Sequence, residues 1–156
     1  PAAALRGLRL FVGSGGCVSC HGGPNFSDGE FHPGVTANAS LTDSGRLGDA
    51  RGLQASAFNL TTASNDDATR HNAGATRNLV VHDGLSGRYR TPSLRNASVT
   101  APYFHNGQTE RLVDAVQHAQ RLSATEASDL AAFVSTLTDA HGARRPWDSS
   151  GLHRCP

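Results

Sequence analysis

The sequence predicts an all-α domain in which long irregular loops surround a group that is not a side chain. Helical patterns lie near both ends of the 156 residues, and between residues 22 and 100 neither helical nor strand periodicity persists. Leu, Val and Phe together number only 30, about 19 % of the chain, which is close to the level typical of disorder. The net charge of +1 argues against disorder. We therefore infer that something other than side chains completes the core.

The first helix is expected over residues 1–12. Pro1 suits a helix start, and Leu5, Leu8 and Val12 share one helical face. Three glycines within residues 13–16 end the pattern.

The strongest helical pattern lies near the other end of the chain. Ser123 and Glu126 form a Ser-x-x-Glu capping box. The apolar residues that follow at helical spacing are Leu130, Phe133, Val134 and Leu137. Upstream, Thr109 is the expected cap of a helix that carries Leu112, Val113 and Val116.

The domain is predicted to span residues 1–141, followed by an irregular arm over 142–156. A long segment without periodicity counts against a compact domain unless it surrounds a large rigid ligand. The arm holds Trp147, which either packs on its own domain or docks against another chain, and Cys155, which is either a free thiol or a link to a partner.

Composition excludes two classes of partner. The 14 basic residues are balanced by 13 acidic ones, so no basic face for nucleic acid is expected. No apolar run approaches the ~18 residues that a membrane-spanning helix needs.

The most informative motif is Cys17-Val18-Ser19-Cys20-His21. Cys-x-x-Cys-His is the attachment signal for c-type haem. Two intervening residues let both thiols reach the two vinyl groups on one edge of the porphyrin, and the adjacent imidazole then binds the iron. A porphyrin is also a large apolar plane, which would supply the burial that the side chains lack.

Two other readings of the cysteine pair remain open. A zinc site needs four ligands, which Cys17 and Cys20 would have to complete with His153 and Cys155. A thioredoxin-like redox pair expects a surrounding βαβ pattern, and the sequence shows none.

Four segments of the sequence resemble the C-terminal haem domain of the bacterial di-haem cytochrome c peroxidase and MauG family. They are residues 4–11, residues 23–32, the run Arg90-Thr91-Pro92-Ser93-Leu94-Arg95-Asn96 with its continuation over 100–107, and the helices from Leu112 onward. The resemblance implies a cytochrome c-like fold around one covalently bound haem c, with Cys17 and Cys20 as anchors and His21 as the proximal iron ligand.

The resemblance also implies partners, a second metal and a location. The family pairs two haem domains, so the second would come from another domain or chain, and a redox partner protein is expected. Matched residue by residue, the carbonyls of Thr100 and Pro102 would bind a calcium ion, for which oxygen ligands are suited. Covalent haem attachment takes place outside the cytoplasm, so a periplasmic or other extracytoplasmic location is expected.

The sixth iron ligand departs from the family pattern. The family has Met or Tyr where this chain has Ala119, whose methyl group cannot bind iron. His118 is one residue earlier, and a small helix shift would bring it to the iron. An open or water-bound iron is the alternative, and the remaining candidates are His71, His82, Tyr103 and a partner's residue.

Arg90 and Arg95 are candidate partners of the haem propionates, because a guanidinium matches a carboxylate; surface charge is the alternative role for each. The predicted function is single-electron transfer through haem, as the C-terminal-type half of a peroxidase-like oxidoreductase. The alternatives are a stand-alone mono-haem carrier without catalysis and a peroxide-reacting mono-haem enzyme with an open distal site.

Overall fold

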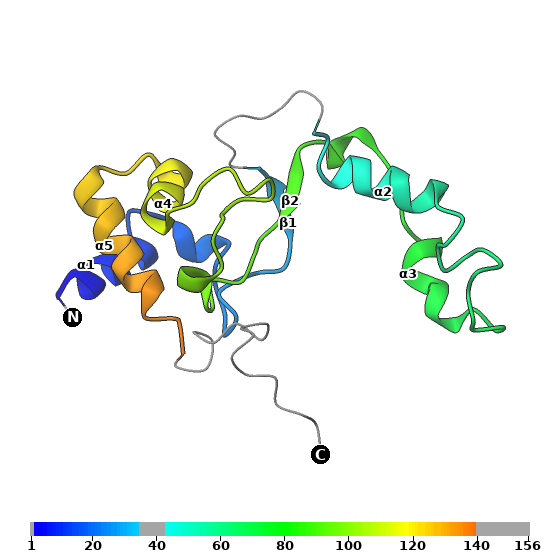
Figure 1. Cartoon of the computed structure of the whole chain (residues 1–156), viewed down its shortest axis with the longest axis horizontal. Coiled ribbons are helices and arrows are strands. Elements are labelled where there is room, and N and C mark those ends of the chain that lie inside the picture. Colours follow the sequence, from blue (N-terminus) through cyan, green and yellow to red (C-terminus); the bar gives the residue numbers. More distant parts are fainter. Residues whose placement is uncertain (1, 35–42, 140–156) are drawn as a thin grey trace, which may run out of the picture. The chain divides into compact units, whose positions relative to one another are not determined.

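A computed structural model describes residues 2–34 and 43–139, which form two compact units. The first unit comprises residues 2–30 and 91–139 and contains α1 (Ala2–Val12), α4 (Leu112–Gln120) and α5 (Ala124–Ser135). The second comprises 31–34 and 43–90 and contains β1 (Phe31–Pro33), α2 (Arg46–Ala55), α3 (Gly74–Arg77) and β2 (Arg88–Arg90) (Figure 1). The predicted arm over 142–156, with Trp147 and Cys155, lies outside the described residues.

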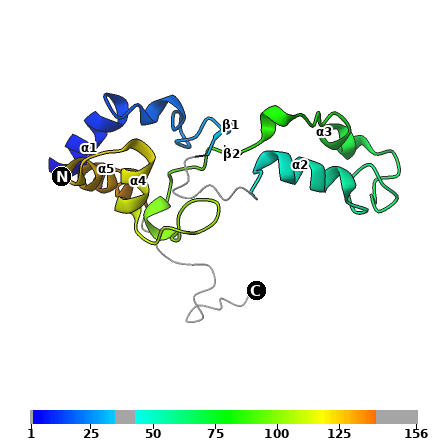
Figure 2. The same cartoon turned by 90° about the horizontal axis from the view of Figure 1, so that it is seen from above.

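The core of the first unit lies where α1 packs against α5 (Figure 2). Phe11 of α1 is 2 % exposed, and it meets Leu130 and Val134 of α5, which are 3 % and 2 % exposed. The helix expected over residues 1–12 is confirmed for Ala2–Val12, and residue 1 lies outside the described residues. However, the face that packs on α5 holds Gly7 and Phe11, and Leu5 and Val12 are 56 % and 57 % exposed.

Gly7 makes the close crossing of α1 and α5 possible. A Cβ atom built at Gly7 would collide with the backbone carbonyl of Asp129 and lie 2.9 Å from the Cβ of Phe133. Only a residue without a side chain therefore fits here.

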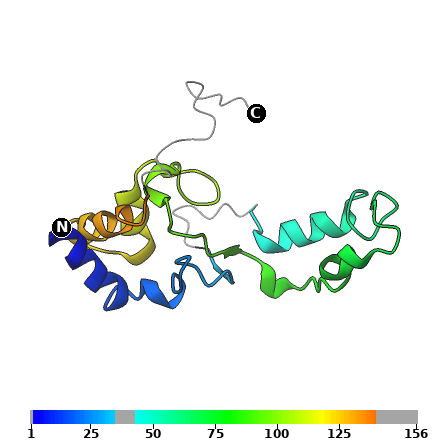
Figure 3. The same cartoon turned by 90° about the horizontal axis from the view of Figure 1, so that it is seen from below.

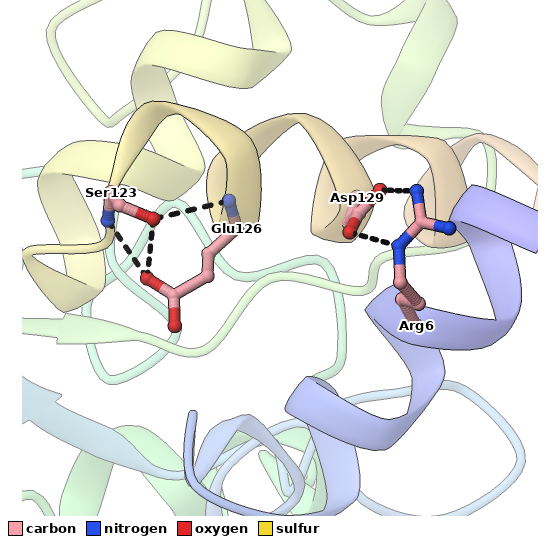
Figure 4. A network of polar contacts seen from close by, with 4 residues as sticks. All are labelled: Arg6, Ser123, Glu126 and Asp129. Carbon is pink, nitrogen blue, oxygen red and sulfur yellow. Dashed lines mark hydrogen bonds and ion pairs between the residues drawn. The ribbon is translucent and has the colours of Figure 1, made fainter.

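A charged pair fixes the register of the same two helices. Arg6 donates through Nε to Oδ2 of Asp129 at 2.6 Å and through Nη2 to Oδ1 at 2.7 Å (Figure 4). Two parallel bonds of this kind give geometric specificity as well as attraction. The hydrogen bonds from Arg6 lower the pKa of the Asp129 carboxyl, and burial acts in the opposite direction.

The capping box at the start of α5 is confirmed. The Glu126 N–H donates to Ser123 Oγ at 3.3 Å, and the Ser123 N–H donates to Glu126 Oε2 at 3.0 Å (Figure 4). By contrast, Thr109 does not cap α4, which begins after Arg111 without a side-chain cap. The Thr109 carbonyl instead accepts from the N–H of Tyr103 at 2.7 Å, in an isolated antiparallel bridge.

The second unit contains the sheet that the all-α prediction missed. Strands β1 and β2 pair antiparallel, with Phe31 opposite Arg90 and Pro33 opposite Arg88. Each strand has three residues, which is too short for an alternating pattern to stand out from the sequence.

Helix α2, the longest helix of the second unit, was also missed (Figure 3). It contains two glycines, and only Leu47 and Ala50 of its residues are buried. Its sequence therefore shows little of the apolar stripe that marks a helix. The guanidinium of Arg46 lies 4.2 Å from the centre of the Phe31 ring and joins the start of α2 to β1.

Helices of the described residues are too short or too polar for any of them to cross a bilayer.

Candidate functional site

The Cys-x-x-Cys-His motif follows α1 directly and forms a single tight turn. Backbone bonds from Gly15 to Leu10 (2.9 Å) and from Gly16 to Gly13 (3.0 Å) end the helix. Gly16 has a φ of 62°, a left-handed conformation that suits glycine. The motif then begins with a 3₁₀ turn over Cys17–Ser19.

Backbone hydrogen bonds fold the motif into one helical turn. The N–H of Cys20 donates to the Cys17 carbonyl at 3.3 Å, and the N–H of His21 donates to the same carbonyl at 2.9 Å. Cys20 and His21 thus each lie one helical turn after Cys17, at the i+3 and i+4 spacings at which side chains are neighbours on a helix surface. All three are half-buried, both thiols are free, and burial raises the pKa of the Cys17 thiol.

The imidazole of His21 is held by a backbone carbonyl. Its Nδ1 lies 3.0 Å from the carbonyl oxygen of Phe26. A carbonyl can only accept, so Nδ1 carries the proton in this bond and the lone pair of Nε2 is left available. Metal-bound histidines are oriented in this way, by a hydrogen bond from the ring nitrogen that does not bind the metal.

A loop that folds back on the motif places the Phe26 carbonyl. The N–H of Ser27 donates to Gly22 at 3.0 Å, and the N–H of Asp28 donates to Cys20 at 2.8 Å. Phe26 itself has a φ of 50°, which is unusual for a non-glycine residue. Backbone of this kind persists where the surroundings enforce it.

The ring of Phe26 belongs to the core at the α1–α5 crossing. Its centroid lies 6.1 Å from that of Phe11 and 6.5 Å from that of Phe133, and both ring pairs are edge-to-face. Phe11 and Phe133 are 5.1 Å apart. The three rings therefore connect the helix crossing to the carbonyl that holds His21.

The residues of this unit fit a covalently bound haem. Covalent haem attachment requires two thiols for the vinyl groups and an imidazole with an available Nε2 for the iron, and the motif provides all three. The fully buried core is small, and apolar side chains around it are only partly buried, as expected of a core that a further apolar body completes. These are Cys17, Phe26, Leu94, Leu112, Val116, Leu122 and Leu137.

His118, the predicted sixth ligand, lies near the end of α4 and is exposed. Its ring stands edge-on to Phe104, with 5.8 Å between centroids. It lines an open hollow of ≈ 490 Å³ together with Asp114, Gln117, Arg121 and Leu122. Ala119, beside it, is half-buried.

The other candidates for the sixth ligand lie in varied surroundings. His71 and His82 are exposed residues of the second unit. The Tyr103 hydroxyl donates to the Ala97 carbonyl at 3.0 Å, and burial raises the pKa of the phenol.

The predicted propionate partners lie in different units. Arg90 is an exposed residue of β2. Arg95 belongs to the first unit, where Nε donates to the Pro24 carbonyl at 2.7 Å and the guanidinium lies 5.4 Å from the centre of the Phe26 ring. Thr100 and Pro102 are exposed, and the Thr100 hydroxyl donates to Ala97; calcium binding by their carbonyls stays a prediction.

Sequence reasoning did not identify the backbone at Phe26 as part of the site. A signal was present, because Gly22, Gly23 and Pro24 together indicate a turn directly after His21. Which carbonyl this turn would aim at the imidazole cannot be read from residue types.

The sequence is similar to proteins named cytochrome c peroxidase and MauG, although no family model matches it. It is 31 % identical over 160 residues to cytochrome-c peroxidase IdrP1 of Denitromonas iodatirespirans, and 32 % identical over 146 residues to the cytochrome c551 peroxidase of Nitrosomonas europaea. The methylamine utilization protein MauG of Methylorubrum extorquens is 26 % identical over 150 residues. These alignments cover 88 %, 86 % and 86 % of this chain.

A solved structure shares the fold. It is the crystal structure of a MauG-like protein associated with microbial copper homeostasis, with a TM-score of 0.56 and 24 % identity over 94 % of this chain and 50 % of that one. The chain spans 40 %, 34 % and 34 % of the three relatives' lengths. At about 30 % identity over most of its length, this chain is similar to proteins named cytochrome c peroxidase and MauG, and these matches support the di-haem peroxidase and MauG family.

Proposed function

We propose that this chain binds one haem c and serves as a one-electron redox domain. The observation that carries the proposal is the turn at Cys17, Cys20 and His21, with His21 Nδ1 bonded to the Phe26 carbonyl at 3.0 Å. The names of the similar proteins, which are cytochrome c peroxidases and MauG, support it. A haem c held there supplies ferric–ferrous electron transfer.

The residues of the motif divide the work of holding the group. Cys17 and Cys20 would form the thioether links, and the turn between them sets their separation. His21 would bind the iron through Nε2. The Phe26 carbonyl keeps the proton on Nδ1, so Nε2 would be the nitrogen that offers a lone pair to the iron.

Expression in a bacterium that attaches c-type haem in its periplasm tests the proposal. The purified chain is expected to show a Soret band, and its mass after denaturation is expected to exceed the polypeptide mass by one haem. Cys17→Ala/Cys20→Ala should lose the covalent haem. Ser19→Ala, which leaves both thiols and the imidazole in place, should keep it. A colourless wild-type chain without a mass adduct would refute the proposal.

We propose further that the chain is one haem-bearing part of a peroxidase-type oxidoreductase outside the cytoplasm, in the position of the family's C-terminal haem domain. Support comes from its length, since it spans 34–40 % of the relatives and leaves room in them for a second domain. Reduction of hydrogen peroxide to two water molecules consumes two electrons and two protons, and because this haem would pass one electron at a time, a second haem would supply the other electron. A native mass that contains this chain alone would instead favour the stand-alone carrier.

A second candidate is a haem that meets peroxide itself. It is favoured by the small side chain of Ala119, which cannot bind iron at the position where the family has Met or Tyr. In that case cyanide or peroxide should change the absorption spectrum of the ferric protein. A low-spin spectrum that neither compound changes would exclude it, and His118→Ala would then show whether His118 is the ligand responsible.

A further inference from the structure

A second segment, about seventy residues along the chain, holds the loop that contacts His21. Ser93 Oγ donates to the Asn25 carbonyl at 2.7 Å, and Arg95 Nε donates to the Pro24 carbonyl at 2.7 Å. The two carbonyls directly before that of Phe26 are therefore both fixed by side chains from the segment 93–95.

The two side chains are themselves connected. The N–H of Arg95 donates to Ser93 Oγ at 3.1 Å, so this hydroxyl bridges the two segments. The guanidinium of Arg95 also lies 5.4 Å from the centre of the Phe26 ring, within the range of a cation–π contact.

The loop needs these contacts because the backbone of Phe26 has an unfavourable conformation. Phe26 has a left-handed φ of 50°, a conformation that costs a non-glycine residue free energy. A loop that relaxed from it would turn the Phe26 carbonyl away from His21 Nδ1, which lies 3.0 Å away.

We propose that Ser93 and Arg95 are positioning residues that fix the proton and orientation of the His21 imidazole through the loop 24–26. The proposal rests on the proposed function, in which His21 binds haem iron. A hydrogen bond from Nδ1 makes an imidazole a stronger donor at Nε2, and a stronger donor stabilises ferric over ferrous iron. Loosening the loop should therefore favour reduction.

The test uses the haem-loaded chain of 156 residues and measures its reduction potential. Ser93→Ala removes one loop bond without changing charge, and it should raise the equilibrium constant for reduction by up to about tenfold, which for one electron is 59 mV. Ser93→Thr keeps the hydroxyl and should restore most of the wild-type potential. Arg95→Lys keeps the charge but loses the planar fork, and it should shift the potential in the same direction as Ser93→Ala.

The control is Ser135→Ala in α5, whose hydroxyl also donates to a backbone carbonyl, that of Ala131 at 2.8 Å. Its potential should equal that of the wild type. A second readout is solvent exchange of the His21 Nδ1 proton in the ferrous protein, which should become faster in Ser93→Ala. If Ser93→Ala fails to fold, Arg95→Lys carries both measurements.

Failures of the two proposals are distinguishable. A wild-type chain that takes up no haem would overturn the proposed function and this inference with it. A haem-loaded wild type whose potential is unchanged by Ser93→Ala and Arg95→Lys would overturn this inference alone, even if both variants lose thermal stability.

Discussion

Replacing Gly7 by alanine should separate α1 from α5. The added Cβ would meet the backbone carbonyl of Asp129 and the Cβ of Phe133, at 2.9 Å from the latter. Neither atom can rotate away, so relief requires the helices to move apart. Overpacking of a filled core costs about 1–3 kcal/mol or more, whereas glycine to alanine within a helix gains about 0.5–1 kcal/mol. We expect a net loss of about 2 kcal/mol in the free energy of unfolding.

The measurement is urea and thermal unfolding of the haem-loaded chain. A loss of about 2 kcal/mol corresponds to a fall of about 4–8 °C in Tm for a chain of this size. The matched control is Gly52→Ala in α2, where an added Cβ would meet nothing within 4 Å. That variant should be equal to the wild type or more stable by up to about 1 kcal/mol. If Gly7→Ala were as stable as Gly52→Ala, the close crossing of α1 and α5 would be disproved.

Three further predictions concern stability. The pKa of Asp129 is lowered in the folded chain, so its contribution to the free energy of unfolding is present above the ordinary carboxyl pKa and is lost as the pH falls through the lowered value. Urea midpoints between pH 6 and 2 should therefore fall less steeply in Asp129→Asn than in the wild type. Equal slopes would contradict this prediction. Ser123→Ala should cost about 1 kcal/mol through loss of the cap of α5, measured by urea unfolding, and a loss below 0.3 kcal/mol would speak against the cap. The haem-free Cys17→Ala/Cys20→Ala chain should lack a cooperative thermal transition in circular dichroism, because haem supplies much of the burial; such a transition would show that the side chains suffice.

The parts of the fold that could be predicted from the sequence are those whose structure depends only on residues close together in the chain. The capping box at Ser123 and Glu126 is formed within one turn. The apolar stripe that follows it is buried in the core at Leu130, Phe133 and Val134, as helical spacing predicts. The attachment motif is equally local, since two thiols and an imidazole at fixed spacing define it without reference to distant residues.

The parts that were missed depend on contacts between distant segments. The buried face of α1 is set by Gly7, which no scale of hydrophobicity selects, because it is chosen for its lack of a side chain against Asp129 and Phe133. Strand β1 exists only through its pairing with β2, almost sixty residues later. In each case the deciding interaction joins residues that a window of the sequence does not contain.

The site combines both kinds of information at Phe26. Its ring packs with Phe11 and Phe133 in the helix crossing, and its carbonyl holds His21. A substitution at Phe26 would therefore change the core and the ligand together, and loss of function there would not show which was responsible. Ser93 acts on the neighbouring carbonyl of Asn25, and its removal takes nothing from the three rings. The potential of the Ser93 variant thus separates what the core contributes to the fold from what the loop contributes to His21, the proposed iron ligand.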